Sequence, residues 1–400
     1  MTELPVVDVG PIAHGGHCVA RLDGQVVFVR HALPGERVRI RITERSKRFL
    51  RADAIEIIDA APGRVEPPCQ YAGECGGCDF QHAAPATQRN LLTSVVREQL
   101  RRLAGIEWDG EVQAVAPDAL GWRTRVTWAV DRHGRAGLRR HRSHDVVPVD
   151  RCLIAHPDLP EMLDQDWDDR SVESIVSSTG ERLAVTDASI ADEMEARVDG
   201  VVARDGTPRG GSPHLHEQVH HRTFRVTGSG FWQVHPAAAT TLVDAVLEAA
   251  AVRPGDHIVD LYAGVGLFTA FLAEATGPAG RVVWVESDRG ASVDARENLA
   301  GLPVELVPRR TEQALRRGEV GEHADVVVLD PPRTGAKEAV ADIAALDART
   351  VVYVACDPAA LARDLKTFAA HGYRLDTLRA FALFPMTHHV ECVARLVVDA

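Results

Sequence analysis

The sequence predicts three parts: an amino-terminal β-barrel, a central α+β region, and a carboxyl-terminal α/β domain with a Rossmann-like sheet. Short alternating strands with Gly-containing turns predict the barrel in residues 1–60. A cysteine loop and a helix with one apolar side, over residues 87–103, open the central region of residues 61–225. Buried-type strands that alternate with helices predict the α/β domain of residues 226–400.

The barrel carries much of the positive charge of an acidic chain. The formal net charge of -12 argues against a polyanionic partner, but seven basic residues stand against one acid between residues 37 and 51. Alternation places Arg37, Arg39 and Arg41 on one face of a strand and apolar residues on the other. Such barrels bind nucleic acid through a basic strand face. We therefore expect a nucleic-acid contact here, with a solvated strand face as the alternative.

Four of the seven cysteines suggest a metal site. No apolar leader segment precedes the first strand, so a reducing cytoplasm is expected and disulfides are not. Cys69, Cys75 and Cys78 lie in a Pro- and Gly-rich loop, where three thiolates can converge. A fourth ligand must come from elsewhere in the chain, and Cys152 follows a Pro-containing strand. Four thiolates suit structural zinc or an iron–sulfur cluster, and the spacing does not separate the two.

A glycine loop between a strand and a helix predicts a site for a nucleotide-like cofactor. A buried-type strand over residues 258–261 leads through Tyr262-Ala263-Gly264-Val265-Gly266 into a helix. The next strand ends at Glu286, about 20 residues after the loop, where an acid can bind ribose hydroxyls. A nicotinamide dinucleotide is the rival ligand, but its fingerprint requires a third glycine where this chain has Thr269. S-adenosylmethionine fits this set better.

A cysteine and a glutamate stand at the ends of two apolar strands. Cys356 comes where one strand breaks into the helix-starting Asp357-Pro358, and Glu391 begins the other. An Asp-Pro-Pro-Arg turn at Asp330 follows a third strand. Carbon 5 of a pyrimidine becomes nucleophilic when a thiolate adds to carbon 6, and a base must then remove the carbon 5 proton. The pair predicts carbon-5 methylation with Cys356 as nucleophile and Glu391 as base, against the alternative of a buried structural cysteine.

Together these motifs resemble the bacterial RNA (uracil-5)-methyltransferases, a class I, S-adenosylmethionine-dependent family. The resemblance covers nearly the whole chain and rests on the order and spacing of five motifs, including Phe231-Trp232-Gln233-Val234. It is closest to the branch that acts on 23S ribosomal RNA and has an amino-terminal TRAM domain and an iron–sulfur cluster. The resemblance implies a methyltransferase sheet, a TRAM or OB-like barrel, and a central domain that holds a 4Fe-4S cluster.

The resemblance also implies roles for single residues. It makes Cys356 and Glu391 catalytic. The residues that it implies around the methyl donor and the target base are Gln233, Tyr262, Glu286 and Asp330. The implied cluster ligands are Cys69, Cys75, Cys78 and Cys152, with structural zinc as the alternative metal.

The expected activity is methyl transfer from S-adenosylmethionine to carbon 5 of a specific uridine, through a covalent bond between Cys356 and uracil. The resemblance favours ribosomal RNA over transfer RNA as the partner, and we expect a cytoplasmic monomer. A non-catalytic iron–sulfur RNA-binding protein and an enzyme that methylates exocyclic nitrogens are the alternatives. No apolar stretch approaches the roughly 18 residues of a membrane span, so no membrane partner is expected.

Overall fold

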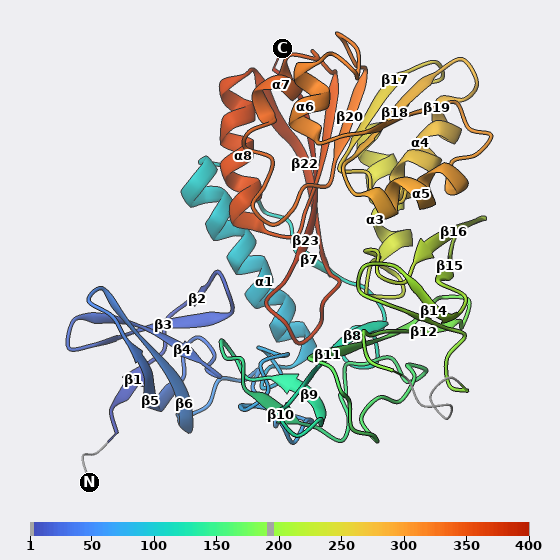
Figure 1. The fold of residues 1–400 in the computed structure, drawn as a ribbon. Helices are drawn as coiled ribbons and strands as arrows, with labels where there is room; N and C mark the ends of the chain where they lie inside the picture. Colours follow the sequence, from blue (N-terminus) through green and yellow to red (C-terminus); the bar gives the residue numbers. More distant parts are fainter. Residues whose placement is uncertain (1–3, 190–195, 400) are drawn as a thin grey trace.

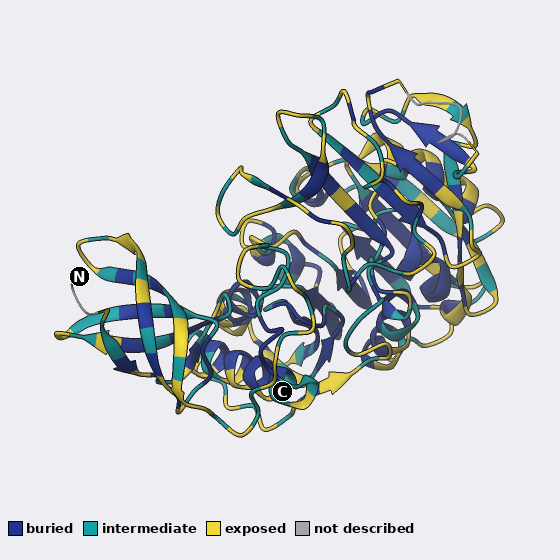
Figure 2. Cartoon of the chain, turned by 90° about the horizontal axis from the view of Figure 1, so that it is seen from below, coloured by how far each residue is buried: buried dark blue, intermediate teal, exposed yellow. Residues whose placement is uncertain are grey.

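Three β-sheets and a separate hairpin organise the part of the chain that the structure describes. The computed structural model describes residues 4–189 and 196–399. Figure 1 shows the first six strands set apart at the amino-terminal side and a helix-covered mixed sheet at the other end. Seen from below, the amino-terminal sheet projects from the rest of the molecule (Figure 2). No helix among the described residues is long and apolar enough to cross a membrane.

The amino-terminal sheet contains the strands that alternation and turn residues predict. They are β1 (Val6–Asp8), β2 (Ile12–Ala13), β3 (His17–Leu22), β4 (Gln25–Arg30), β5 (Arg37–Arg45) and β6 (Phe49–Asp59), in the order β1-β5-β6-β4-β3-β2. Asp23 and Gly24 both have positive φ, as a tight Asp-Gly hairpin between β3 and β4 requires. Val38 and Ile40 of β5 are buried, whereas Arg37 and Arg41 are exposed.

The cysteine loop is followed by a helix that joins the two halves of the molecule. Helix α1 (Pro85–Gln99) continues into a short π-helical turn, η1 (Leu100–Ala104). Its apolar side is buried, as the one-sided apolar pattern predicts, and α1 and η1 pack on α8 (Pro358–Ala370). Strand β7 (Val112–Ala114) then pairs with β22 (Tyr373–Ala382) and so becomes an edge strand of the carboxyl-terminal sheet.

The central region is a second sheet with a hairpin beside it. Its strands are β8 (Arg125–Val130), β9 (Ala136–Arg139), β10 (Val146–Pro148), β11 (Ser171–Val176), β12 (Arg182–Val185), β13 (Gly200–Val202) and β14 (Pro208–Gly211), in the order β10-β9-β8-β11-β12-β13-β14. The hairpin consists of β15 (His214–Val219) and β16 (Arg222–Thr227). Trp128 and Trp167 lie in the core on one face of this sheet.

The carboxyl-terminal sheet has the order β19-β18-β17-β20-β21-β23-β22-β7. Its further strands are β17 (His257–Leu261), β18 (Arg281–Glu286), β19 (Val304–Pro308), β20 (Val326–Leu329), β21 (Thr350–Ala355) and β23 (Glu391–Val398). Strand β23 runs antiparallel between β21 and β22, and the other pairs are parallel. Strands β20 and β21 are buried along their whole length, as continuous Val-rich runs predict for central parallel strands.

Helices cover both faces of this sheet and create two apolar cores (Figure 1). The remaining helices are α3 (Ala238–Ala250), α4 (Leu267–Thr276), α5 (Arg289–Asn298), α6 (Thr311–Arg316) and α7 (Val340–Ala344). From β17 the chain adds β18 and β19 on one side and then crosses to add β20 and β21 on the other. Folds with such a switch bind ligands in the crevice at the carboxyl ends of the strands beside it, which here are β17 and β20.

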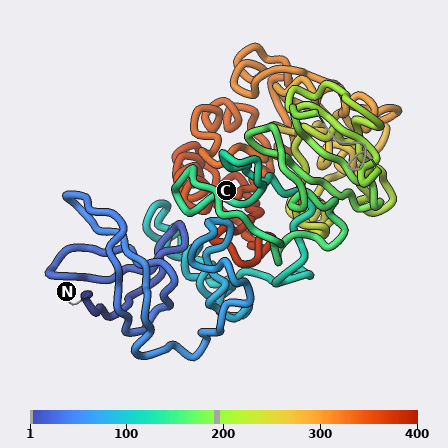
Figure 3. The backbone as a smooth tube through the Cα atoms, turned by 60° about the horizontal axis from the view of Figure 1, so that its bottom comes forward, coloured from blue at the N-terminus to red at the C-terminus, as the bar shows by residue number. Residues whose placement is uncertain are grey.

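The sheets cross the predicted domain bounds. Strand β7 precedes residue 225 but belongs to the carboxyl-terminal sheet, and β16 runs through residue 225. The backbone trace in Figure 3 likewise brings the segment that follows the first six strands beside the carboxyl-terminal segment, where Asp79 and Phe80 bond to Met386. The division of the chain at residues 60 and 225 therefore stays a proposal.

Candidate active site

One large cavity lies at the carboxyl ends of the central strands of the mixed sheet. Its volume is about 1240 Å³. This exceeds the roughly 300–1,000 Å³ of a typical small-molecule site, so it has room for a cofactor and a second ligand. All six residues predicted for catalysis and donor binding line it: Gln233, Tyr262, Glu286, Asp330, Cys356 and Glu391.

The glycine loop is held in one conformation by bonds to β18. Tyr262, Gly264 and Gly266 have positive φ, and Gly266 caps the start of α4. The Gly264 amide donates to Glu286 Oε2 over 3.2 Å, and Trp284 Nε1 donates to the Gly264 carbonyl over 3.0 Å. The other Glu286 oxygen accepts from the amides of the two residues that follow it. The glutamate is thereby fixed at the cavity wall.

Thr269 takes the position of the third glycine of a dinucleotide fingerprint, and its side chain has a different use. Its hydroxyl donates to Asp260 Oδ2 over 2.5 Å in the fully buried base of the loop. Burial raises the pKa of Asp260 to about 7. In a dinucleotide site the third glycine lets the helix pack closely on the strand. In the described loop Thr269 makes a side-chain hydrogen bond at this position instead, which argues against a nicotinamide dinucleotide.

The sheet register brings the predicted nucleophile and base together. Cys356 directly follows β21, and Glu391 begins the neighbouring antiparallel strand β23, in which Cys392 pairs with Ala355. Asp357 caps α8 by accepting from the Ala360 amide over 2.7 Å, so the helix starts where the Asp-Pro signal predicts. Asp330 follows the next strand, β20, and completes the cluster.

The cluster is acidic and poorly hydrated. Burial raises the pKa of Cys356 to about 11, and the negative charges of Glu391 and Asp330 add to the rise. Burial and Asp330 raise the pKa of Glu391 well above its usual range, and burial raises the pKa of Asp330 to about 7. The charge of Arg333 opposes the rise at both Cys356 and Glu391. A thiolate at Cys356 therefore depends on this guanidinium and on the groups that a substrate would bring.

The segment before Glu391 is bonded to the cysteine loop, a link that sequence reasoning missed. Asp79 accepts from the His388 amide over 3.1 Å and lies 2.7 Å from its Nδ1. The amides of Asp79 and Phe80 donate to the Met386 carbonyl, and Gln88 bonds both the amide and the sulfur of Met386. Asp79 and His388 both line the cavity. Their only signal in the sequence is that they adjoin Cys78 and Glu391.

The barrel also contacts the nucleophile loop. His14 Nε2 lies 3.0 Å from Asp357 Oδ2, and the pair raises the pKa of His14 and lowers that of Asp357. A Cβ on Gly16 would lie 2.9 Å from the Cβ of His388, so the barrel turn packs directly on the segment that leads to Glu391. The amino-terminal domain thus lies against both strand ends of the candidate site.

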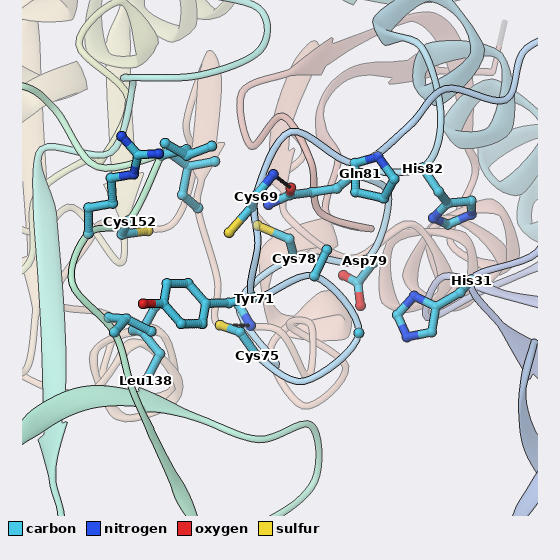
Figure 4. A pocket seen from close by; sticks show the side chains of 18 of the residues that line it. His31, Cys69, Tyr71, Cys75, Cys78, Asp79, Gln81, His82, Leu138 and Cys152 are labelled. Atoms are coloured by element: carbon cyan, nitrogen blue, oxygen red, sulfur yellow. Dashed lines mark hydrogen bonds between the residues drawn. The ribbon is translucent and has the colours of Figure 1, made fainter. Parts of the chain in front are cut away.

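The four cysteines predicted as ligands line a separate cavity of about 270 Å³. Figure 4 shows the Cys152 sulfur directed from one wall toward the sulfurs of Cys69 and Cys78 on the other. Burial raises the pKa of Cys75 and Cys152 and raises that of Cys78 to about 12. In the described residues, however, no three His, Cys, Asp or Glu side chains are grouped closely enough to hold a metal ion. The predicted central domain with an iron–sulfur cluster is therefore not supported by this geometry.

Two family profiles match parts of the chain. The profile of the TRAM domain matches residues 6–55, and that of tRNA (uracil-5-)-methyltransferase matches residues 317–398. The second match includes the Asp330 turn and both predicted catalytic residues. The fold is similar to that of the Pyrococcus abyssi tRNA (uracil-54, C5)-methyltransferase in complex with S-adenosyl-L-homocysteine. The TM-score is 0.74, with 24% identity over 98% of this chain and 99% of that one.

Two relatives are similar to this chain over nearly its whole length. A Streptomyces avermitilis protein described as an uncharacterized RNA methyltransferase is 48% identical over 99% of this chain and 98% of its own length. The 23S rRNA (uracil(1939)-C(5))-methyltransferase RlmD of Alkalilimnicola ehrlichii is 31% identical over 96% of this chain and 94% of its own. These similarities span the barrel, the central region and the cavity alike. The chain belongs to the RNA (uracil-5-)-methyltransferase family.

Proposed function

We propose that this enzyme methylates carbon 5 of a specific uridine through a covalent bond between Cys356 and carbon 6. Its family makes it an S-adenosylmethionine-dependent RNA (uracil-5-)-methyltransferase. The observation that carries the covalent route is the strand register, which puts Cys356 and Glu391 at adjacent strand ends over a cavity that also contains the glycine loop. The rise in the Cys356 pKa fits a thiol that is protected until substrate arrives.

The proposed chemistry divides between the two side chains. The Cys356 thiolate adds to carbon 6, and the ring electrons shift to make carbon 5 nucleophilic. S-adenosylmethionine would supply an electrophilic methyl group: carbon 5 bonds to this methyl as the bond between the methyl and the sulfonium sulfur breaks, and S-adenosylhomocysteine leaves. The Glu391 carboxylate then removes the carbon 5 proton, and the sulfur–carbon 6 bond breaks to restore the double bond and the thiolate. Burial of Glu391 suits it to this role, because its raised pKa makes it a stronger base than a solvated carboxylate.

The donor half of the cavity has a proposed role for each remaining residue. Glu286 is proposed to accept from the ribose hydroxyls, and Tyr262 to pack beside the adenosyl group. Gln233 and Asp330 are proposed to lie between the donor and the target base. The support for these roles is that all four line the cavity that contains Cys356.

Replacement of Glu286 tests the donor site. Glu286→Ala should weaken S-adenosylmethionine binding by about 10- to 100-fold, because two charge-assisted hydrogen bonds are lost. Isothermal titration calorimetry measures this directly. Glu305→Ala is the matched control, since Glu305 lies on the next strand and pairs only with exposed Arg281 among the described residues. Equal affinities for both variants would place the ribose elsewhere.

A gel experiment tests the covalent route against its alternatives. RNA that contains 5-fluorouridine cannot lose fluorine to the base, so the enzyme should stay bonded to it through Cys356 in a denaturing gel. An enzyme that methylates exocyclic nitrogens would methylate RNA without this adduct, and a non-catalytic RNA-binding protein would do neither. Methylation at carbon 5 without any adduct would refute the covalent mechanism.

We propose 23S ribosomal RNA as the target, with a transfer RNA uridine as the second candidate. The support is the relative from Alkalilimnicola ehrlichii, whose similarity covers nearly the whole chain. The Pyrococcus abyssi protein, which acts on transfer RNA, shares the fold at lower identity. Mass spectrometry of 5-methyluridine in ribosomal and transfer RNA from a deletion strain distinguishes the two, because the modification should vanish from only one of them.

We also propose that Cys69, Cys75, Cys78 and Cys152 bind a 4Fe-4S cluster. The donor set fits, since four free thiols line one cavity whose loop is rich in small residues. Binding requires the thiols to approach one another more closely than they do here. It also requires them to ionise, and burial opposes this because it raises the pKa of Cys75, Cys78 and Cys152. The cluster would tie the cysteine loop to the central sheet.

The cluster proposal predicts coloured protein. Purified without oxygen, the enzyme should be brown and contain iron and acid-labile sulfide, and Cys152→Ser should lose both. Cys18→Ser is the control, because Cys18 is buried in the barrel, apart from the thiol cavity. Colourless protein that contains one zinc ion would instead support the structural zinc alternative.

A further inference from the structure

A strip of aromatic and cationic side chains runs along the outer face of the barrel toward the active-site cavity. Strands β4 and β6 pair in parallel, with Phe28 opposite Arg51 and Arg30 opposite Asp53. Because Val27 and Val29 point into the barrel core, Phe28 and Arg30 point out. We call the set of Phe28, Arg30, Phe49, Arg51 and His17 the aromatic strip.

One cation lies beside two rings of the strip. The Arg51 guanidinium lies 5.6 Å from the Phe28 ring and 5.1 Å from the Phe49 ring, and the two rings meet edge to face at 5.5 Å. Its carboxylate partner among the described residues is the exposed Glu44, at 3.2 Å from Arg51 Nε. A guanidinium beside half-exposed rings is a surface on which a base can stack and a phosphate can bind.

The strip continues onto the central domain. The tip of the β9–β10 hairpin reaches toward the barrel (Figure 1), and the His141 ring lies 5.9 Å from that of His17. Arg142, beside it, is exposed and has positive φ. His141 also lines the active-site cavity, together with Asp79 and His388. The strip therefore leads from the barrel to the place where the target base would enter.

Polar atoms in this junction have no hydrogen-bond partner among the described residues. They are His17 Nε2, Arg30 Nη2 and Asp53 Oδ1, and all three are buried. Asp53 Oδ1 lies 3.6 Å from Arg30 Nη1, beyond hydrogen-bond reach. Burial lowers the pKa of His17 to about 4, and the positive charges of Arg51, Arg142 and Arg30 add to the fall, so these arginines lie near the ring. Buried donors are nearly always satisfied, so the unpartnered Arg30 donor and the two further arginines fit an anionic ligand.

The arginine row of β5 is a weaker candidate for the same role. Its members face acids across the β5–β6 pair: Arg37 is opposite Asp59, and Arg39 bonds Glu56 over 2.6 Å. The Arg39 charge is thus compensated within the barrel itself.

We propose that the aromatic strip binds single-stranded RNA next to the target uridine, with bases stacked on Phe28 and Phe49 and a phosphate bound by Arg30, Arg51 and Arg142. This rests on the proposed function, because it assumes that an RNA strand enters the cavity beside His141. It assigns a residue-level contact to the barrel and explains how an acidic protein can hold a polyanion.

The test measures binding without chemistry. Each variant is made in a Cys356→Ala background and titrated with a fluorescein-labelled oligouridine about 12 nucleotides long, within the range of one OB-like barrel. Arg51→Gln and Arg142→Gln should each weaken binding by about 3- to 10-fold and reduce the log–log salt slope by about 0.7. Phe28→Leu should weaken binding by at least about 5-fold with an unchanged slope, because it removes stacking and no charge. Arg37→Gln removes the same charge from an exposed arginine of β5 that lies outside the strip, so it is the matched control and should change neither quantity.

Retained S-adenosylmethionine binding shows that each variant is folded. Unchanged affinity and slope in both arginine variants would overturn the proposal, and so would equal losses in Arg37→Gln, since binding would then follow net charge alone. Because this assay needs no methyl transfer, its outcome is independent of the 5-fluorouridine experiment. If no 5-fluorouridine adduct forms but the strip variants still weaken RNA binding, the RNA contact is supported and the covalent mechanism is not. If the adduct forms but the strip variants bind RNA normally, only the strip proposal fails.

Discussion

Cys356→Ala should abolish uridine methylation, with a loss of more than about 10⁴-fold, because no other described group can add to carbon 6 from the end of β21. Tritium transfer from labelled S-adenosylmethionine measures the loss, and the 5-fluorouridine adduct should vanish with it. Donor affinity should stay within about 2-fold of the parent enzyme, since the glycine loop lies on other strands.

Cys392→Ala is the informative control for that result. Cys392 pairs with Ala355 one residue from the nucleophile, but its side chain is fully buried in the sheet. The control should keep its activity and its adduct. If Cys356→Ala retained turnover while Cys392→Ala lost it, the roles of the two thiols would have to be exchanged.

Glu391→Gln should form the covalent intermediate, transfer the methyl group and then stall. The amide keeps the size of the carboxylate but cannot accept the carbon 5 proton. General bases typically contribute about 10²- to 10⁴-fold, so turnover should fall in that range. With ordinary uridine RNA and labelled donor, a denaturing gel should show labelled RNA bonded to protein.

The double variant Cys356→Ala, Glu391→Gln separates a stalled adduct from a trapped complex, because it should show no bonded RNA at all. Turnover by Glu391→Gln at the parent rate would point to Asp330, the other carboxyl of the cluster, as the base. The same gel decides between these outcomes.

Much of the carboxyl-terminal domain could be predicted, because its signals are local. The Val-rich strands, the glycine loop and the Asp357-Pro358 helix start each declare themselves within about ten residues. Parallel strands in a doubly wound sheet bring their carboxyl ends to one crevice, so six residues that are far apart in the sequence could be expected to share one cavity.

What could not be predicted depends on contacts between distant segments. Asp79 and His388 have no common local pattern, and their bond exists only because the cysteine loop packs on the end of β22. The pairing of β7 with β22 and the ion pair of His14 with Asp357 are of the same kind. The cysteine spacing predicted a metal site, and the four thiols do line one cavity. Their distances, which depend on how the central sheet positions Cys152, group no three metal ligands among the described residues.

The bonds between the cysteine loop and the Met386 segment have a consequence for how the protein is made. Gln88 and Met386 are 298 residues apart, and Asp79 and His388 are 309 apart. At roughly 5–20 residues per second, a ribosome needs about 15–60 s to bridge that interval. During this time the apolar side of α1 lacks α8, and the cysteine loop lacks the segment that holds it. The nascent amino-terminal part thus exposes its thiols and an apolar helix face until α8 and the Met386 segment have been synthesised, which makes it a natural client for chaperones.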